Sequence, residues 1–181
     1  MSLQIDGGEP GPALLRRAYA TAALLVGAVA AGLCWLLLGG TSAPSPAVAL
    51  VRPMLALFWL TALVWLVMLV ARNAAVLRGK ASLRYFAAYQ VDHPAEHVER
   101  PARTFDNLMQ VPTLFYVVCL LMLVTQHADA KQVALAWAFV ALRALHAALY
   151  ITLNRLPLRF ASWVSSCLAL GVLWYRFGAM M

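Results

Sequence analysis

The stretch LRALHAALYITLNRLPLR, from Leu142 to Arg159, places an arginine and a histidine inside an otherwise apolar segment. Of the 181 residues in the chain, 64% are hydrophobic and only 12% are charged, and the mean hydropathy is +0.78. Such values are typical of an integral membrane protein. Because a charge at membrane depth is costly and usually functional, Arg143 and His146 are the first candidates for a site.

Several apolar segments are long enough to cross a membrane. Roughly 17 to 25 apolar residues suffice to cross a bilayer as a helix. Segments of this kind lie at Ala18 to Leu38, Pro53 to Ala71, Phe105 to Gln126, Val133 to Leu153 and Leu158 to Tyr175. The sequence therefore predicts an all-α integral membrane protein.

The basic residues indicate orientation rather than a nucleic-acid surface. The net charge is +7, but the Lys and Arg residues lie between apolar segments and form no continuous stripe. Most of them fall on the side that holds the N-terminus and the polar loop at about residues 72–103. An excess of Lys and Arg marks the cytoplasmic side of a membrane protein. The N-terminus and this loop are therefore predicted to be cytoplasmic, and no nucleic-acid partner is expected.

Two of the apolar segments carry a polar face. On a helix of 3.6 residues per turn, one wedge of about 80° collects four polar residues of the fourth segment. These are Arg143, His146, Tyr150 and Asn154. A wedge of about 100° collects another four at the cytoplasmic start of the third segment. These are Arg103, Asp106, Asn107 and Gln110.

Lipid cannot solvate such faces, so they should turn toward each other, a neighbouring subunit or a water-accessible cavity. Several donors with few acids favour an anion, and Arg159 after the Pro157 turn adds a cation near the same interface. A purely structural role stays open. Arg143 could pair with Asp106 or cap backbone carbonyls, and His146 could be a packing residue.

A metal site is a weaker hypothesis. His93 and His97 are four residues apart with acidic neighbours, a spacing that suits zinc on a helix. Pro94 fits only the first turn of such a helix, and no third distant ligand is evident. A solvated loop is the favoured interpretation, and no metal is predicted.

Two stretches resemble the MAPEG family, the membrane-associated proteins in eicosanoid and glutathione metabolism. They are ARTFDNLMQVPTLFY at Ala102 to Tyr116 and LRALHAALYITLNRLPLRF at Leu142 to Phe160. With the preceding RGKASLRYF, the resemblance covers about residues 54–175 and is closest to small bacterial members. It implies a four-helix bundle at residues 48–181, with residues 1–47 as a tail, one extra N-terminal transmembrane helix and a linker. A bacterial inner membrane is the implied location.

The resemblance also implies a ligand and residue roles. Members of the family form homotrimers that bind glutathione as a co-substrate between adjacent subunits, near the cytoplasmic face. Arg159 matches the arginine that stabilises the glutathione thiolate, which makes it the expected catalytic residue. The expected glutathione-binding residues are Arg103, Asn107, Gln110, Arg143, His146 and Tyr150.

Some positions depart from the family pattern. Gln110 stands where a glutamate is usual, so it offers no charge to the ammonium of glutathione. Phe160 replaces a serine, and Trp163 stands where a tyrosine is expected. The leading expectation is a glutathione-dependent transferase or peroxidase for lipophilic electrophiles or hydroperoxides. The alternatives are a non-catalytic protein that binds a lipid or amphiphile and, less favoured, a small transporter subunit.

Overall fold

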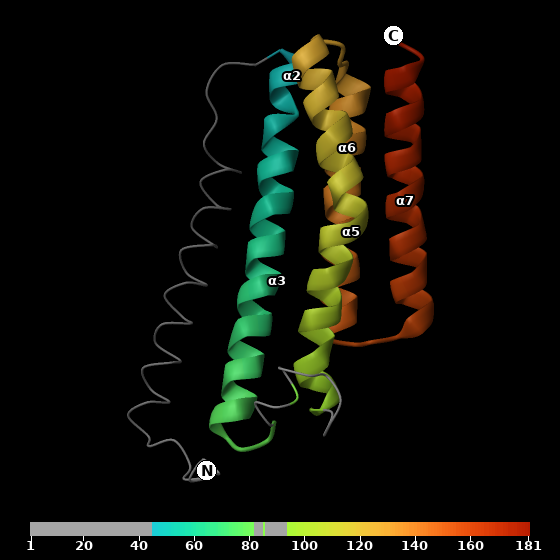
Figure 1. Cartoon of the computed structure of the whole chain (residues 1–181). Helices are drawn as coiled ribbons and strands as arrows, with labels where there is room; N and C mark the ends of the chain where they lie inside the picture. The colour runs from blue at the N-terminus through green and yellow to red at the C-terminus, as the bar shows by residue number, and fades with distance from the viewer. Residues whose placement is uncertain (1–44, 82–84, 86–93) are drawn as a thin grey trace.

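The computed structural model describes residues 45–81, 85 and 94–181. Within these residues every regular element is a helix, and no strand is present. The helices are α2 (Pro46–Ala49), α3 (Val51–Leu77), α5 (Glu96–Thr125), α6 (Ala130–Ile151) and α7 (Leu156–Gly178). Figure 1 shows that the four long helices run up and down beside one another. The fold class predicted from the sequence is confirmed.

All four long helices can cross a membrane. Among the described residues, the spans are Pro46–Leu77, Glu96–Thr125, Ala130–Ile151 and Leu156–Gly178, each judged by length and composition. Many large apolar side chains point outward, including Leu114 and Val124 on α5 and Leu168 on α7. In water such a surface would be a liability, whereas in a bilayer it contacts lipid tails. The chain is an integral membrane protein.

Turn chemistry sets where the helices begin and end. Asp129 begins α6 with a capping box, in which its carboxylate accepts the Gln132 N–H while the Gln132 side chain accepts the Asp129 N–H. Two of the described turns use a left-handed residue other than glycine, Gln126 after α5 with φ 57° and Asn154 after α6 with φ 48°. Asparagine is among the non-glycine residues that tolerate this region best, so Asn154 suits the tight turn into α7.

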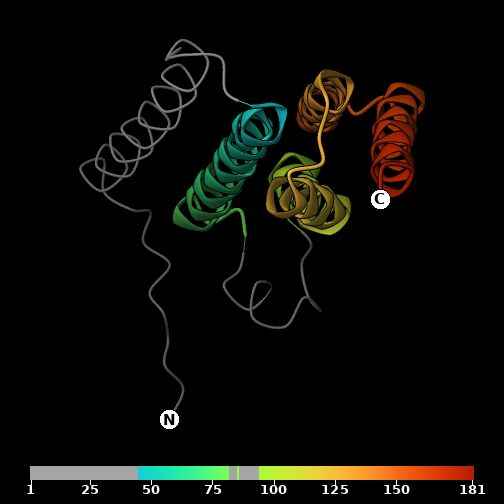
Figure 2. The same cartoon turned by 90° about the horizontal axis from the view of Figure 1, so that it is seen from above.

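The apolar core lies where α5 and α6 meet the other two helices. Phe115 of α5 stacks on Phe139 of α6, with ring centroids 4.7 Å apart and planes 14° apart. Leu57 of α3 and Leu173 of α7 complete the same buried cluster. Figure 2, viewed from above, shows α5 and α6 between α3 and α7. The two helices that carry the predicted polar faces are therefore the central ones.

The helix bounds differ from the predicted apolar segments at the end of the bundle where α3 ends and α5 begins. Helix α3 continues to Leu77 and α5 already begins at Glu96, so the loop predicted at about 72–103 is shorter than expected. Hydropathy marks only the part of a helix that crosses lipid. The additional turns carry charged side chains, such as Arg72 on α3, and Glu96 and Glu99 in the first turn of α5 suit the positive end of its dipole. The predicted helix at Ala18 to Leu38 lies outside the described residues.

Candidate functional site

Arg143 on α6 lies completely inside the bundle. Its side chain is 0% exposed. Its Nη2 donates to the main-chain oxygen of Asn107 at 2.9 Å, and its Nη1 lies 3.3 Å from the Asn107 side-chain oxygen. In the part of the chain that the structure describes, no carboxylate lies within ion-pair distance of this guanidinium. The predicted alternative that Arg143 pairs with Asp106 is therefore wrong, whereas the alternative that it binds a backbone carbonyl is confirmed by its contact with Asn107. Its positive charge is held by neutral oxygens.

His146, one turn further along α6, has one ring nitrogen engaged and one open. Its side chain is 4% exposed, and Nδ1 lies 2.9 Å from the carbonyl oxygen of Arg159. A carbonyl can only accept, so Nδ1 carries the hydrogen and Nε2 of the neutral ring is an acceptor. Nε2 is buried and has no hydrogen-bond partner among the described residues. A buried acceptor without a partner indicates a place where a ligand with a donor can bind.

Arg159, in the first turn of α7, is held from three sides. Its carbonyl accepts from His146 and from the Ser162 hydroxyl at 2.9 Å. Its guanidinium carbon lies 3.6 Å from the ring centroid of Tyr150, a close cation–π contact. Its Nη1 donates to the side-chain oxygen of Asn154 at 2.5 Å. The other guanidinium N–H groups have no hydrogen-bond partner in the described chain, so they are available to an anion.

His146 and Arg159 line a cavity of about 220 Å³. Its walls come from α5, α6 and α7: Asn107, His146, Tyr150, Leu156, Arg159, Phe160 and Trp163. One wall is polar and cationic. The other is apolar, with the Phe160 and Trp163 rings stacked at 6.5 Å between centroids and 23° between planes. Such a cavity suits a ligand with an anionic or polar end and an apolar neighbour.

The structure brings some of the predicted site residues together and leaves others apart. Asn107, His146, Tyr150 and Arg159 line the cavity, and Arg143 reaches it through Asn107. The other three polar residues of the predicted α5 face do not line it. Arg103, Asp106 and Gln110 are exposed on the surface of α5. Asn154 is also not on the α6 helix as predicted, because α6 ends at Ile151 and Asn154 lies in the turn that follows.

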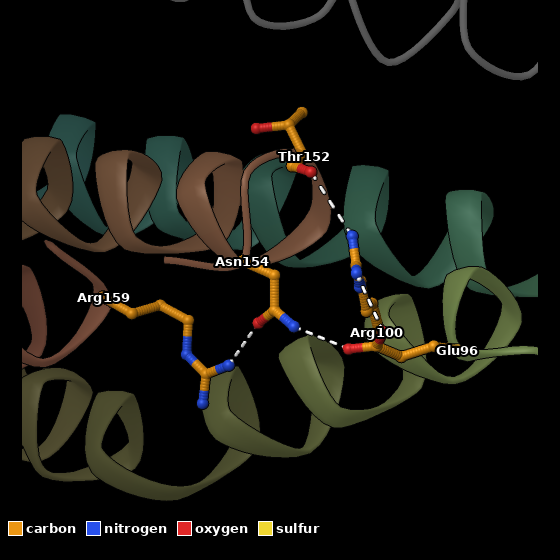
Figure 3. Close-up of polar contacts among 5 residues, drawn as sticks. All are labelled: Glu96, Arg100, Thr152, Asn154 and Arg159. Atoms are coloured by element: carbon orange, nitrogen blue, oxygen red, sulfur yellow. Dashed lines mark hydrogen bonds and ion pairs between the residues drawn. The ribbon is translucent and has the colours of Figure 1, made fainter. Parts of the chain in front are cut away.

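The structure also shows a polar network beside the cavity that the sequence did not predict. Glu96 at the start of α5 accepts from the Asn154 side-chain amide at 2.6 Å and from Arg100 at 3.0 Å. Arg100 also donates to the Thr152 carbonyl at 3.4 Å. Figure 3 shows that these contacts continue to Arg159. Because Glu96 and Asn154 are far apart in sequence, no local pattern indicates this contact.

The weaker zinc hypothesis paired His93 with His97. His93 lies outside the described residues.

Comparison with known proteins identifies the bundle. No curated protein and no solved structure gave a match. Residues 55–179 match the MAPEG family. The match begins in the second turn of α3, ends just after α7 and includes every residue of the cavity. This match spans well over half of the chain and confirms the resemblance carried by the two polar stretches. The chain belongs to the MAPEG family.

Proposed function

We propose that this protein is a glutathione-dependent membrane transferase or peroxidase that acts on lipophilic electrophiles or hydroperoxides. Family membership supports a glutathione-related membrane function in general. The observation that carries the finer proposal is the pairing, in one cavity, of an unpartnered acceptor at His146 with unpartnered N–H donors at Arg159. Both groups favour ionisation of a thiol, because one accepts the proton and the other stabilises the sulfur anion.

The chemistry begins with the thiol. A free thiol has a pKa of about 8.5, so it is mostly protonated at neutral pH, and a nearby cation lowers that pKa. In the proposed site Arg159 holds the sulfur anion, while Nε2 of His146 accepts the departing proton. The guanidinium suits this role because it keeps its charge in apolar surroundings. Asn107, fixed by Arg143, provides an adjacent amide for the peptide part of glutathione.

The thiolate then reacts with a substrate that arrives from the bilayer. In transfer, its lone pair forms a bond to an electrophilic carbon, and the leaving group departs with its electron pair or the addition product takes up a proton. With a hydroperoxide, the sulfur attacks oxygen and gives an alcohol and a sulfenic acid. A second glutathione converts the sulfenic acid to a disulfide and water. The apolar wall of Phe160 and Trp163 faces the lipophilic partner.

The proposal includes a homotrimer in a bacterial inner membrane, with the N-terminus and the segment between α3 and α5 on the cytoplasmic side. The cavity of about 220 Å³ is smaller than the roughly 300 Å³ at the lower end of ligand pockets. Exposed Arg103 and Gln110 on α5 would meet the ligand only if another copy of the chain closes the site. A site between subunits accounts for both facts.

A second candidate function is the holding of a lipid or amphiphile without chemistry. Phe160 favours it, because this side chain is 63% exposed, stacks on Trp163 and replaces a hydroxyl of the family pattern. Gln110 favours it too, since its neutral amide binds an ammonium less strongly than a carboxylate does. The transporter alternative is less favoured, because the polar residues gather at one end of the bundle and a pathway needs them at both.

The ultraviolet absorbance of thiolate distinguishes these functions. Glutathione is added at neutral pH to detergent-solubilised protein, either wild type or Arg159→Ala. We expect a thiolate signal that the substitution abolishes. Arg155→Ala is the matched control, because Arg155 directly precedes the same helix and its side chain is exposed. Glutathione binding without thiolate would favour the holding function, and an equal signal in Arg159→Ala would refute the assigned role of Arg159.

A further inference from the structure

Asn154 and Glu96 act together on Arg159. Asn154 lies in the turn between α6 and α7, and its side chain bridges two charged groups that come from different helices (Figure 3). Its amide nitrogen donates to Glu96 at 2.6 Å, and its oxygen accepts from Arg159 at 2.5 Å. No other contact among the described residues holds the tip of the Arg159 guanidinium by a hydrogen bond.

The chemistry of the amide makes this bridge directional. A carboxylate can only accept hydrogen bonds, so the NH₂ group of Asn154 must face Glu96. The amide oxygen then necessarily faces Arg159, whose guanidinium can only donate. Glu96 itself is oriented by Arg100, which donates to its other oxygen at 3.0 Å and to the Thr152 carbonyl at 3.4 Å. The carboxylate of α5 thus selects one orientation of the Asn154 amide.

The amide also keeps two opposite charges apart. A carboxylate in direct contact with Arg159 would neutralise it and compete with an anionic ligand. With Asn154 between them, Glu96 orients the guanidinium without pairing with it. The Tyr150 ring, 3.6 Å from the guanidinium carbon, restricts the same group from its face. The result is an arginine that is held in place but keeps N–H donors available.

We propose that Glu96, acting through Asn154, is a positioning residue that fixes the Arg159 guanidinium toward the cavity without neutralising it. The inference rests on the proposed function, because the anion that this arrangement serves there is the glutathione thiolate. The backbone supports it as well. Asn154 has φ 48°, and its N–H donates to the Leu149 carbonyl at 2.8 Å, so the turn that presents its side chain is itself anchored to α6.

Two variants test this role while preserving the fold. Asn154→Gly removes the amide and keeps the left-handed backbone, which glycine adopts readily. Glu96→Gln removes the carboxylate at nearly constant shape, so the Asn154 amide is no longer forced into one orientation. Glu99→Gln is the matched control, with the same change of charge in the same first turn of α5 but outside the network.

The first measurement is the titration of bound glutathione thiol by ultraviolet absorbance, with affinity measured separately by calorimetry at about pH 6, where the free thiol is protonated. We expect Asn154→Gly to lower the thiolate fraction at neutral pH by about three- to tenfold, since a mobile guanidinium stabilises the anion less. Glu96→Gln should act in the same direction, and Glu99→Gln should not. Affinity at the lower pH should change little. A wild-type thiolate signal that both variants retain in full would overturn the inference.

The second measurement does not depend on glutathione. The side-chain Nε resonance of Arg159 is observed by NMR in ¹⁵N-arginine-labelled protein in micelles and identified by its loss in Arg159→Lys. We expect a rigid signal in wild type and Glu99→Gln, and a mobile one in Asn154→Gly and Glu96→Gln. If wild type forms no thiolate, the proposed function fails while this experiment still decides the positioning role. An equally rigid Arg159 in all variants would refute it.

Discussion

Asn107→Ala should destabilise the bundle through the loss of an acceptor for buried Arg143. The substitution removes the side-chain oxygen 3.3 Å from Nη1 and leaves the main-chain oxygen that accepts from Nη2 at 2.9 Å. A hydrogen bond to a charged group contributes about 1.5–3 kcal/mol in soluble proteins, whereas polar contacts between membrane helices average about 0.6 kcal/mol. Because the lost contact is long and the other one remains, we expect a loss of about 1 kcal/mol.

The assay is reversible unfolding of the detergent-solubilised protein by sodium dodecyl sulfate, followed by circular dichroism. A double-mutant cycle with Arg143→Met isolates the contact, since methionine fills the space of the stem without a charge. In the Arg143→Met background, Asn107→Ala should cost nearly nothing, because no buried guanidinium then needs the oxygen. Asn73→Ala is the matched control, since the Asn73 amide donates only within α3, to the Leu69 carbonyl at 2.7 Å. An equal cost of Asn107→Ala in both backgrounds would refute the reasoning.

Three further predictions concern the capping box, the apolar wall and the exposed face of α5. The Gln132 N–H, and then Arg176, hold the pKa of the Asp129 carboxyl below its usual range. The stabilisation by the Asp129 carboxylate is therefore present above the pKa of this group in the unfolded chain, and it is lost as pH falls through the pKa in the folded protein. Asp129→Ala should lower the free energy of unfolding at neutral pH by about 1 kcal/mol and flatten this acid dependence in the same unfolding assay. Phe160→Ala should weaken retention of a fluorescent fatty acid by at least about threefold and leave the glutathione thiolate signal unchanged, because it shortens only the apolar wall; unchanged retention would argue against a lipophilic site there. Gln110→Glu should tighten glutathione binding in calorimetry by about three- to tenfold if a neighbouring subunit brings this face to the ligand's ammonium, and no change would place Gln110 outside the site.

Sequence periodicity was sufficient to predict which side chains of α6 lie inside the bundle. Arg143, His146 and Tyr150 share one helical face, and all three are buried. Periodicity did not predict the end of the helix. Asn154 continues the same spacing, but the helix ends at Ile151 and Asn154 itself adopts the left-handed conformation in the turn that follows. Its side chain therefore reaches Arg159 and Glu96 instead of the interior.

The partner of Arg143 illustrates a different limit. Asp106 and Asn107 are adjacent on α5, and a charge argument favours Asp106. Successive residues on a helix point about 100° apart, so the rotation of α5 about its own axis decides which of the two faces α6. That rotation is set by packing of the whole apolar core, including the stacked Phe115 and Phe139, and it directs Asn107 inward while Asp106 stays exposed.

The selection of Asn107 over Asp106 bears directly on the charge of the cavity. An aspartate facing α6 would neutralise Arg143, and a carboxylate in the place of Asn154 would do the same to Arg159. Both arginines instead donate to side-chain amide oxygens, those of Asn107 and Asn154, and the Asn154 side chain separates Glu96 from Arg159. Neutral acceptors orient a guanidinium but leave its charge to be balanced by something else. With Arg159 lining the cavity and Arg143 buried behind Asn107, an anionic ligand is the electrostatic complement of the site, which is why the thiolate titration is a sharper test than binding alone.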